Sequence, residues 1–187
     1  MEVGRNEIDW SFIQSLEGLE TTGYVPKDGH SGVTIGAGFD IGNHSVQELY
    51  SFNFSIPLLN KLLPYANLTS ASATISLNKN PLELSDAEVQ ELDAKVRVKY
   101  AKQVEDEYDA YSDFTFSFLD TAKQTVLMSV AYQYGSLRKE CPKFFNAMTK
   151  GLWMAAVNEL RNFGDVYRPR RLREAKLLES SLPQTLG

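Results

Sequence analysis

The chain has 187 residues, of which 43% are hydrophobic and 23% charged. These values are those of an ordinary globular domain, and they exclude the disordered, collagen-like and coiled-coil classes. A single cysteine, Cys141, cannot form an internal disulfide. No segment approaches the roughly 18 consecutive apolar residues of a membrane span, and the net charge of −5 argues against a general nucleic-acid binder. We therefore expect a globular chain with no membrane insertion and no nucleic-acid partner.

The charge is unevenly distributed along the chain. Residues 1–40 carry seven acids against two bases, a net charge of −5, and residues 160–176 carry six bases against two acids, a net charge of +4. On charge alone we interpret these segments as two solvated faces.

The first forty residues change from helical to sheet character. Asp9 before an apolar run predicts a capped short helix that ends at Gly18. Seven glycines then separate the β-prone runs 22–25, 33–35 and 39–41. This pattern predicts a small antiparallel sheet with tight turns.

The middle of the chain predicts helices of increasing length. A possible capping box at Ser45–Glu48 opens a short helix, and Pro57 and Pro64 frame the next one. We interpret residues 66–82 as a loop. A second capping box at Ser85–Glu88 precedes a helical pattern that runs to about Glu107, long enough to connect two lobes.

The C-terminal half is predicted to be entirely helical. The apolar run 120–134 indicates a buried helix capped by Gly135, and the segments 142–150, 152–162 and 169–180 predict three shorter helices. The fold class is therefore α+β and mostly helical.

Several enzyme classes are excluded by missing motifs. His30 and His44 are the only histidines, and neither has metal-ligand spacing. The chain has no P-loop and no nucleophile elbow, and Gly36-Ala-Gly38 lacks the third glycine of a dinucleotide site. We expect no metal and no cofactor.

What remains is a set of carboxylates in a glycine-rich sheet. Glu17 follows the first helix between apolar residues, where the anion is disfavoured, as a general acid requires. A solvated glutamate at a helix end explains the same position, and chemistry alone favours that explanation. Asp40 lies in a predicted strand that an aspartate disfavours, whereas Asp28 before Gly29 also fits a plain turn. Thr34 offers a hydroxyl to the same region.

These residues resemble a known family. Glu17-Gly18-Leu19, Gly23-Tyr24-Val25-Pro26 and the run from Thr34 to Asp40 look like the catalytic lobe of T-even phage-type lysozymes, glycoside hydrolase family 24, and most of all its pesticin branch. The segments Met128–Gly135, Trp153–Asn158 and Tyr167–Arg171 resemble the C-terminal helices of that fold. The resemblance covers roughly residues 9–55 and 115–180.

The resemblance implies a single lysozyme-like domain over residues 1–187. Its N-terminal catalytic lobe would cover about residues 9–84, a connecting helix about 85–107 and a helical C-terminal lobe about 110–187. A cleft between the lobes would bind peptidoglycan glycan strands.

The family activity would be hydrolysis of the β-1,4 bond between N-acetylmuramic acid and N-acetylglucosamine. Carried over by motif, Glu17 is the general acid, and Thr34 with an aspartate positions the attacking water, the inverting arrangement. Phage-type spacing places the aspartate six residues before the threonine, at Asp28, and pesticin spacing places it six residues after, at Asp40. We favour Asp40 and keep Asp28 as the alternative. Tyr24, Gln133 and Arg170 are weaker candidates for substrate binding, drawn in part from the arginine cluster 168–171.

The sequence leaves two other functions open: a catalytically silent peptidoglycan-binding module and a lytic transglycosylase, which would need no aspartate. Residues 1–20 lack a signal-peptide pattern. We therefore expect a monomer that is delivered to the periplasm or cell wall as part of a larger secreted toxin or effector, or released as an endolysin. A delivered toxin would also have a cognate immunity protein.

Overall fold

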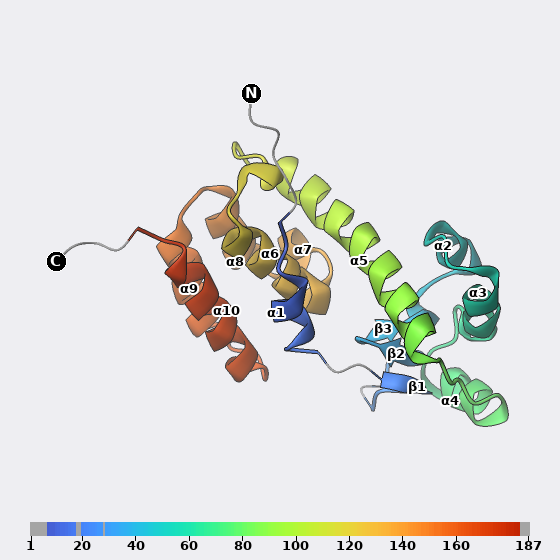
Figure 1. The fold of residues 1–187 in the computed structure, drawn as a ribbon. Coiled ribbons are helices and arrows are strands. Elements are labelled where there is room, and N and C mark those ends of the chain that lie inside the picture. The colour runs from blue at the N-terminus through green and yellow to red at the C-terminus, as the bar shows by residue number, and fades with distance from the viewer. Residues whose placement is uncertain (1–6, 18–19, 28, 184–187) are drawn as a thin grey trace. The chain divides into compact units, whose positions relative to one another are not determined.

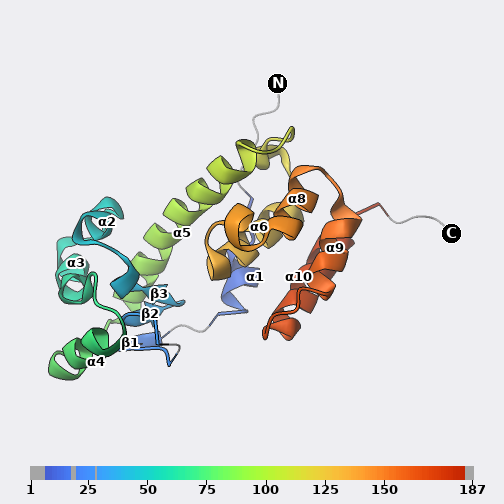
Figure 2. The same cartoon turned by 180° about the vertical axis from the view of Figure 1, so that it is seen from behind.

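The computed structural model describes residues 7–17, 20–27 and 29–183, which form two compact units. We call Glu17–Lys99 the sheet unit. The helical unit consists of the residues up to Leu16 together with those from Tyr100 onward. Figure 1 shows the elements of both units in chain order, and Figure 2 shows them from behind.

The sheet unit begins with three short antiparallel strands in the order β1-β2-β3. They are β1 (Glu20–Tyr24), β2 (Thr34–Gly36) and β3 (Phe39–Asp40), and the 3-10 turn η1 (Ile41–Asn43) follows directly. All three residues of β2 are buried. The predicted small sheet is therefore present, with its most buried strand in the middle.

Four short helical segments follow the sheet: α2 (Val46–Ser51), α3 (Ile56–Leu62), η2 (Leu63–Tyr65) and α4 (Ser70–Lys79). The Ser45–Glu48 capping box that opens α2 is confirmed, because each side chain bonds the other residue's backbone. The expected loop over 66–82 is wrong in part, because α4 occupies most of it. Only Ala73 of that helix is buried, so its sequence carries almost no apolar period to predict it from.

The long helix α5 (Asp86–Asp109) contributes residues to both units. Ser85 accepts a hydrogen bond from the Glu88 amide, and the Glu88 carboxylate accepts one from the Ser85 amide, as the capping box predicts. In the sheet unit α5 packs against β2, since a Cβ added to Gly36 would lie 3.1 Å from the Leu92 side chain.

The helical unit is built around α6 (Thr121–Tyr134), which is buried along the nine consecutive residues Lys123–Ala131. The other elements are α1 (Trp10–Gln14), η3 (Phe116–Phe118), α7 (Leu137–Glu140), α8 (Pro142–Thr149), α9 (Trp153–Arg161) and α10 (Arg168–Ser180). Both views show α9 and α10 side by side (Figures 1 and 2). Gly135 ends α6 with a φ of +76°, as predicted for a glycine cap.

The first helix packs in the helical unit, whereas the expected N-terminal lobe began at residue 9. The amide of Glu7 donates to the Gln124 side chain at 2.7 Å, and the amide of Asp9 donates to Thr125 Oγ1 at 2.8 Å. Ile13 is buried in the core of this unit. These contacts join α1 to α6, more than a hundred residues further along the chain, so the lobe boundary does not follow sequence order. Within the described ranges no helix combines the length and apolarity that crossing a membrane requires.

Candidate active site

Three of the candidate side chains form one row across the sheet of the sheet unit. Tyr24 of β1 is the partner of Thr34, and Thr34 is in turn the partner of Asp40 in β3. Directly opposed residues of antiparallel strands point to the same face, so the register gathers these three side chains on one side of the sheet. The sheet therefore brings Tyr24 and Asp40, which lie sixteen positions apart in the sequence, into one row.

The Asp40 carboxylate is held in one orientation by backbone and side-chain donors. The Gly32 amide lies 3.0 Å from Oδ1 and 3.1 Å from Oδ2. Asn43 donates its amide to Oδ1 at 3.3 Å and its side-chain nitrogen to Oδ2 at 2.8 Å. Asp40 thus caps η1 and presents a fixed, partly exposed anion, as a group that orients a water molecule requires.

Two glycines make this arrangement possible. A Cβ at Gly32 would lie 2.4 Å from the Gly42 Cα and 2.8 Å from Asp40 Oδ1. A Cβ at Gly42 would lie 2.0 Å from the Leu68 carbonyl oxygen. No side chain fits in this contact between backbones, so the two glycines allow the Gly32 amide to reach the carboxylate.

Thr34 lies between the other two members of the row and is 3% exposed. Its Oγ1 donates to the Gly32 carbonyl at 3.3 Å. The same residue, Gly32, therefore orients both the hydroxyl of Thr34 and the carboxylate of Asp40.

Glu17 is half-buried, and its carboxyl group affects the electrostatics of Tyr24. Burial raises the pKa of the Tyr24 hydroxyl, and the negative charges of Glu20, Glu17 and Asp40 raise it further. Glu17 and Asp40 thus both contribute to the electrostatic environment of the Tyr24 hydroxyl. Asp28, the alternative aspartate, lies outside the described residues.

A further buried acid of the sheet unit, Asp93 of α5, was not among the residues predicted from the sequence. It is 4% exposed and accepts a hydrogen bond from Arg97 at 2.7 Å. Burial raises the pKa of Asp93, Arg97 and the Ala37 amide oppose that shift, and the charge of Glu17 adds to it. The signal was present in the helical period, because Asp93 lies between the apolar positions Val89 and Val96 on the buried face.

His44 of the sheet unit belongs to an aromatic cluster. The His44 ring stacks on Phe39 at 4.8 Å and meets Phe52 edge-on at 5.4 Å. Burial lowers the pKa of His44, so the neutral ring is favoured in this packing. The cluster supports β3 directly beside Asp40.

The two weaker candidates of the helical unit, Gln133 and Arg170, take part in a buried polar network. Gln133 Oε1 accepts a hydrogen bond from Arg171, which is 1% exposed. Arg170 donates to Glu174 at 3.2 Å and to the Ser129 carbonyl at 2.9 Å. These contacts tie α10 to α6, so both side chains have a structural role whatever else they bind.

Asp165 and Glu174 supply the negative charge of this network. Burial raises the pKa of Glu174, although Arg171, Ser129 and Arg170 favour its anion. Burial also acts on Asp165, but hydrogen bonds from Tyr134 and Arg171 lower its pKa overall. The network therefore keeps an anionic Asp165 against the buried guanidinium of Arg171.

Comparison with solved structures shows a lysozyme-like fold. The muramidase domain of SpmX from Asticaccaulis excentricus has a TM-score of 0.54 and 14% identity, over 92% of this chain and 94% of that one. The active form of the P1 phage endolysin Lyz has a TM-score of 0.54 and 16% identity, over 94% of this chain and 84% of that one. No curated protein sequence is significantly similar to the chain.

The sequence itself identifies the family. Residues 7–154 match the pesticin family, described as a bacterial toxin homologue of phage lysozyme, C-terminal part. The chain therefore belongs to the pesticin family, and the resemblance inferred from its motifs is confirmed.

Proposed function

We propose that this chain is a muramidase that hydrolyses the β-1,4 bond between N-acetylmuramic acid and N-acetylglucosamine in peptidoglycan, with inversion at the anomeric carbon. Glu17 protonates the leaving oxygen, while Asp40 and Thr34 position the attacking water. Tyr24 contacts the substrate beside them, and Gln133 and Arg170 are weaker candidates for the same role.

One observation carries this proposal: the row Tyr24–Thr34–Asp40 on one face of the sheet, in a chain of the pesticin family. An inverting glycosidase needs one proton donor and one fixed base that leaves room for water. Asp40 is held by donors from Gly32 and Asn43, and a hydroxyl lies beside it in the row. Glu17 supplies the second carboxyl group.

Replacing Glu17 with glutamine is the first test, because this change removes the proton and keeps the shape. We expect the release of reducing ends from purified peptidoglycan to fall at least about 100-fold. The control is Glu20→Gln, an exposed acid of β1 close in sequence, which should keep its activity. Equal activity of the Glu17 variant and the wild type would remove Glu17 from the mechanism.

The identity of the aspartate is tested by comparing Asp40→Asn with Asp28→Asn at matched thermal stability. We expect loss of activity only for Asp40→Asn, and an α-anomeric product by proton NMR immediately after hydrolysis by the wild type. Loss confined to Asp28→Asn would reverse the assignment. Anhydro products with an active Asp40→Asn would indicate a lytic transglycosylase instead.

The biological setting follows from the family description rather than from the geometry. We propose a monomeric wall-lysing toxin or effector domain, or an endolysin, that acts in the bacterial periplasm or cell wall. In the toxin setting a cognate immunity protein protects the producing cell. A folded chain that binds the wall and releases no product would instead favour the catalytically silent binding module.

A further inference from the structure

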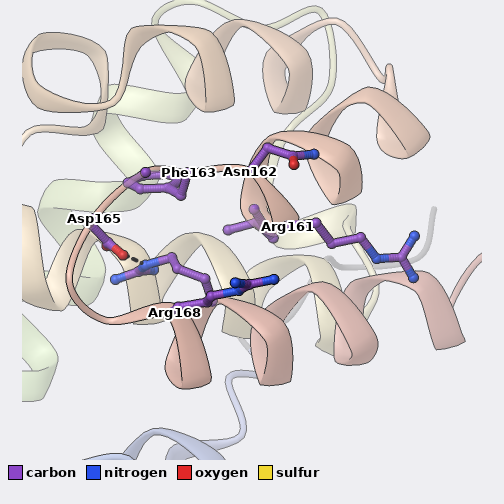
Figure 3. A pocket seen from close by; sticks show the side chains of 8 residues that line it. Arg161, Asn162, Phe163, Asp165 and Arg168 are labelled. Carbon is purple, nitrogen blue, oxygen red and sulfur yellow. Dashed lines mark hydrogen bonds and ion pairs between the residues drawn. The ribbon is translucent and has the colours of Figure 1, made fainter.

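A pocket of about 290 Å³ lies in the helical unit at the turn between α9 and α10. Leu160, Phe163 and Gly164 supply apolar walls, and Arg161, Asn162, Asp165, Arg168 and Arg171 supply polar ones. Figure 3 shows these side chains around the turn, with Asp165 joined by a dashed line to a guanidinium group. All the described residues that line it belong to the helical unit.

Two charged side chains that line the pocket, Asp165 and Arg171, are already paired within the protein. Arg171 forms ion pairs with Asp165 at 2.9 Å and with Glu174. Asp165 also accepts hydrogen bonds from the Tyr134 hydroxyl at 2.7 Å and from the Tyr167 amide at 3.0 Å. These paired groups therefore offer a ligand little net charge.

The remaining arginines of this region differ in what they contact. Arg161 pairs with Glu179 at 2.6 Å, Arg170 with Glu174 at 3.2 Å, and Arg173 donates to Ser15 Oγ at 2.7 Å. Arg168 lines the pocket, is exposed, and has no ion pair or hydrogen bond from its side chain within the described part of the chain. The positive segment 160–176 thus contributes one uncompensated cation to the pocket, and that cation is Arg168.

We propose that this pocket binds a carboxylate of the peptides attached to peptidoglycan, with Arg168 as the pairing cation. A planar guanidinium pairs with a carboxylate through two parallel hydrogen bonds. Phe163, which is partly exposed, provides apolar contact for a short aliphatic side chain of such a peptide, and the volume exceeds what a small inorganic anion needs. The identity of the peptide rests on the proposed function, whereas the carboxylate chemistry rests on the pocket alone.

The experiment measures binding by calorimetry to the full chain carrying Glu17→Gln, so that substrate is not consumed. The probes are a muropeptide (disaccharide with an alanyl-glutamyl peptide), the bare disaccharide, the free N-acetylated peptide and inorganic phosphate. We expect the muropeptide to bind at least ten times more tightly than the bare disaccharide. Adding Arg168→Gln should remove this difference and weaken binding of the free peptide tenfold.

The matched control is Lys176→Gln, which removes one positive charge from an exposed position of the same helix. It should leave both affinities unchanged. Equal affinities for muropeptide and disaccharide, or an Arg168→Gln variant that binds the free peptide as well as its parent, would overturn the proposal. Phosphate binding as tight as that of the peptide would overturn the ligand class. If the wild type proved to have no hydrolytic activity, and peptide binding still depended on Arg168, the result would support the binding pocket and refute only the muramidase proposal.

Discussion

Arg171 is a charged residue placed in the core of the helical unit, with 1% of its surface exposed. Its guanidinium meets Asp165, Glu174 and Gln133, and it lies 4.9 Å from the centre of the Phe163 ring. One positive group thus balances the buried carboxylate of Glu174 and the partly buried carboxylate of Asp165, and it joins α10 to α6. Removing Arg171 leaves the carboxylates of Asp165 and Glu174 without the cation that they share. This loss costs more stability than replacing the whole charged group by apolar residues would.

We therefore expect Arg171→Met to lower the free energy of unfolding by about 3–5 kcal/mol. The comparison is Arg161→Met, whose partner is Glu179 and whose side chain is 41% exposed. Solvent screens that pair, so its loss should cost less than about 1 kcal/mol. Urea denaturation of both variants measures the difference, and equal losses would contradict the importance we give to burial.

Cys141 shows how burial controls a single reactive group. It is 5% exposed, and burial raises the pKa of its thiol to about 11. Because the folded thiol keeps its proton, the reactive thiolate at pH 8 should be about a hundredfold scarcer than in an ordinary cysteine. We expect a disulfide reagent to label the native chain at least about a hundred times more slowly than the urea-unfolded chain. Rapid labelling of the native chain at pH 8 would show that the thiol is accessible and ionised.

At the scale of elements, the turn that carries Asp40 depends on contact between two backbones. A methyl group at Gly42 would lie 2.0 Å from the Leu68 carbonyl oxygen and 2.6 Å from the Gly32 Cα. Both neighbours are main-chain atoms, so neither can move aside without shifting the segment before β2 or the segment before α4. The Gly32 amide that holds Asp40 would move with them.

We expect Gly42→Ala to destabilise the chain by about 1–3 kcal/mol or more and to reduce hydrolysis beyond the loss of folded protein. Gly38→Ala separates crowding from backbone strain. Gly38 has a φ of +94° and no atom within 4 Å of an added Cβ. Gly38→Ala should therefore lower the free energy of unfolding only by the backbone strain, roughly 1 kcal/mol. Thermal unfolding and activity per folded molecule are the measurements, and the expectation fails if the two alanine variants behave alike.

Local signals predicted most of the elements. Capping boxes marked the starts of α2 and α5, and Gly135 marked the end of α6, because each is a chemical signature within a few residues. α4 has almost no apolar face, so periodicity could not find it. The grouping of α1 with α6 depends on hydrogen bonds over more than a hundred residues, which no local pattern encodes.

The candidate site was predictable only where side chains follow a motif. Thr34 and Asp40 lie within one short run that resembles the family motif, so the resemblance favoured Asp40 over Asp28, and the register of the sheet makes Thr34 and Asp40 cross-strand partners. The roles of Gly32 and Asn43 as donors to Asp40 depend on the register of the sheet and on the η1 turn. The contacts of Gln133 with Arg171 and of Arg170 with Glu174 are visible only in three dimensions, and the role of both residues in substrate binding stays a prediction.

At the scale of the whole molecule, half of the bases in the positive segment 160–176 are paired inside the helical unit. Of the six bases in residues 160–176, Arg161, Arg170 and Arg171 pair with carboxylates of the same unit. For the proposed function, a net charge of −5 offers no general attraction to an anionic cell wall. Specific contacts, such as the one proposed for Arg168, become correspondingly more important.

The order of the units along the chain gives the last prediction. Ile13 of α1 is 2% exposed in the core of the helical unit, although most of that unit lies after residue 100. Ile13→Ala should therefore lower the free energy of unfolding by about 2–5 kcal/mol. Because each unit has its own buried residues, the loss should fall mainly on the helical unit. Amide hydrogen exchange should show reduced protection in α6, with smaller changes in β1–β3.

Val98→Ala is the control, since Val98 is 73% exposed in the sheet unit and should change stability by less than about 0.5 kcal/mol. If Ile13→Ala left the protection of α6 unchanged, or weakened only the sheet, the assignment of α1 to the helical unit would be wrong.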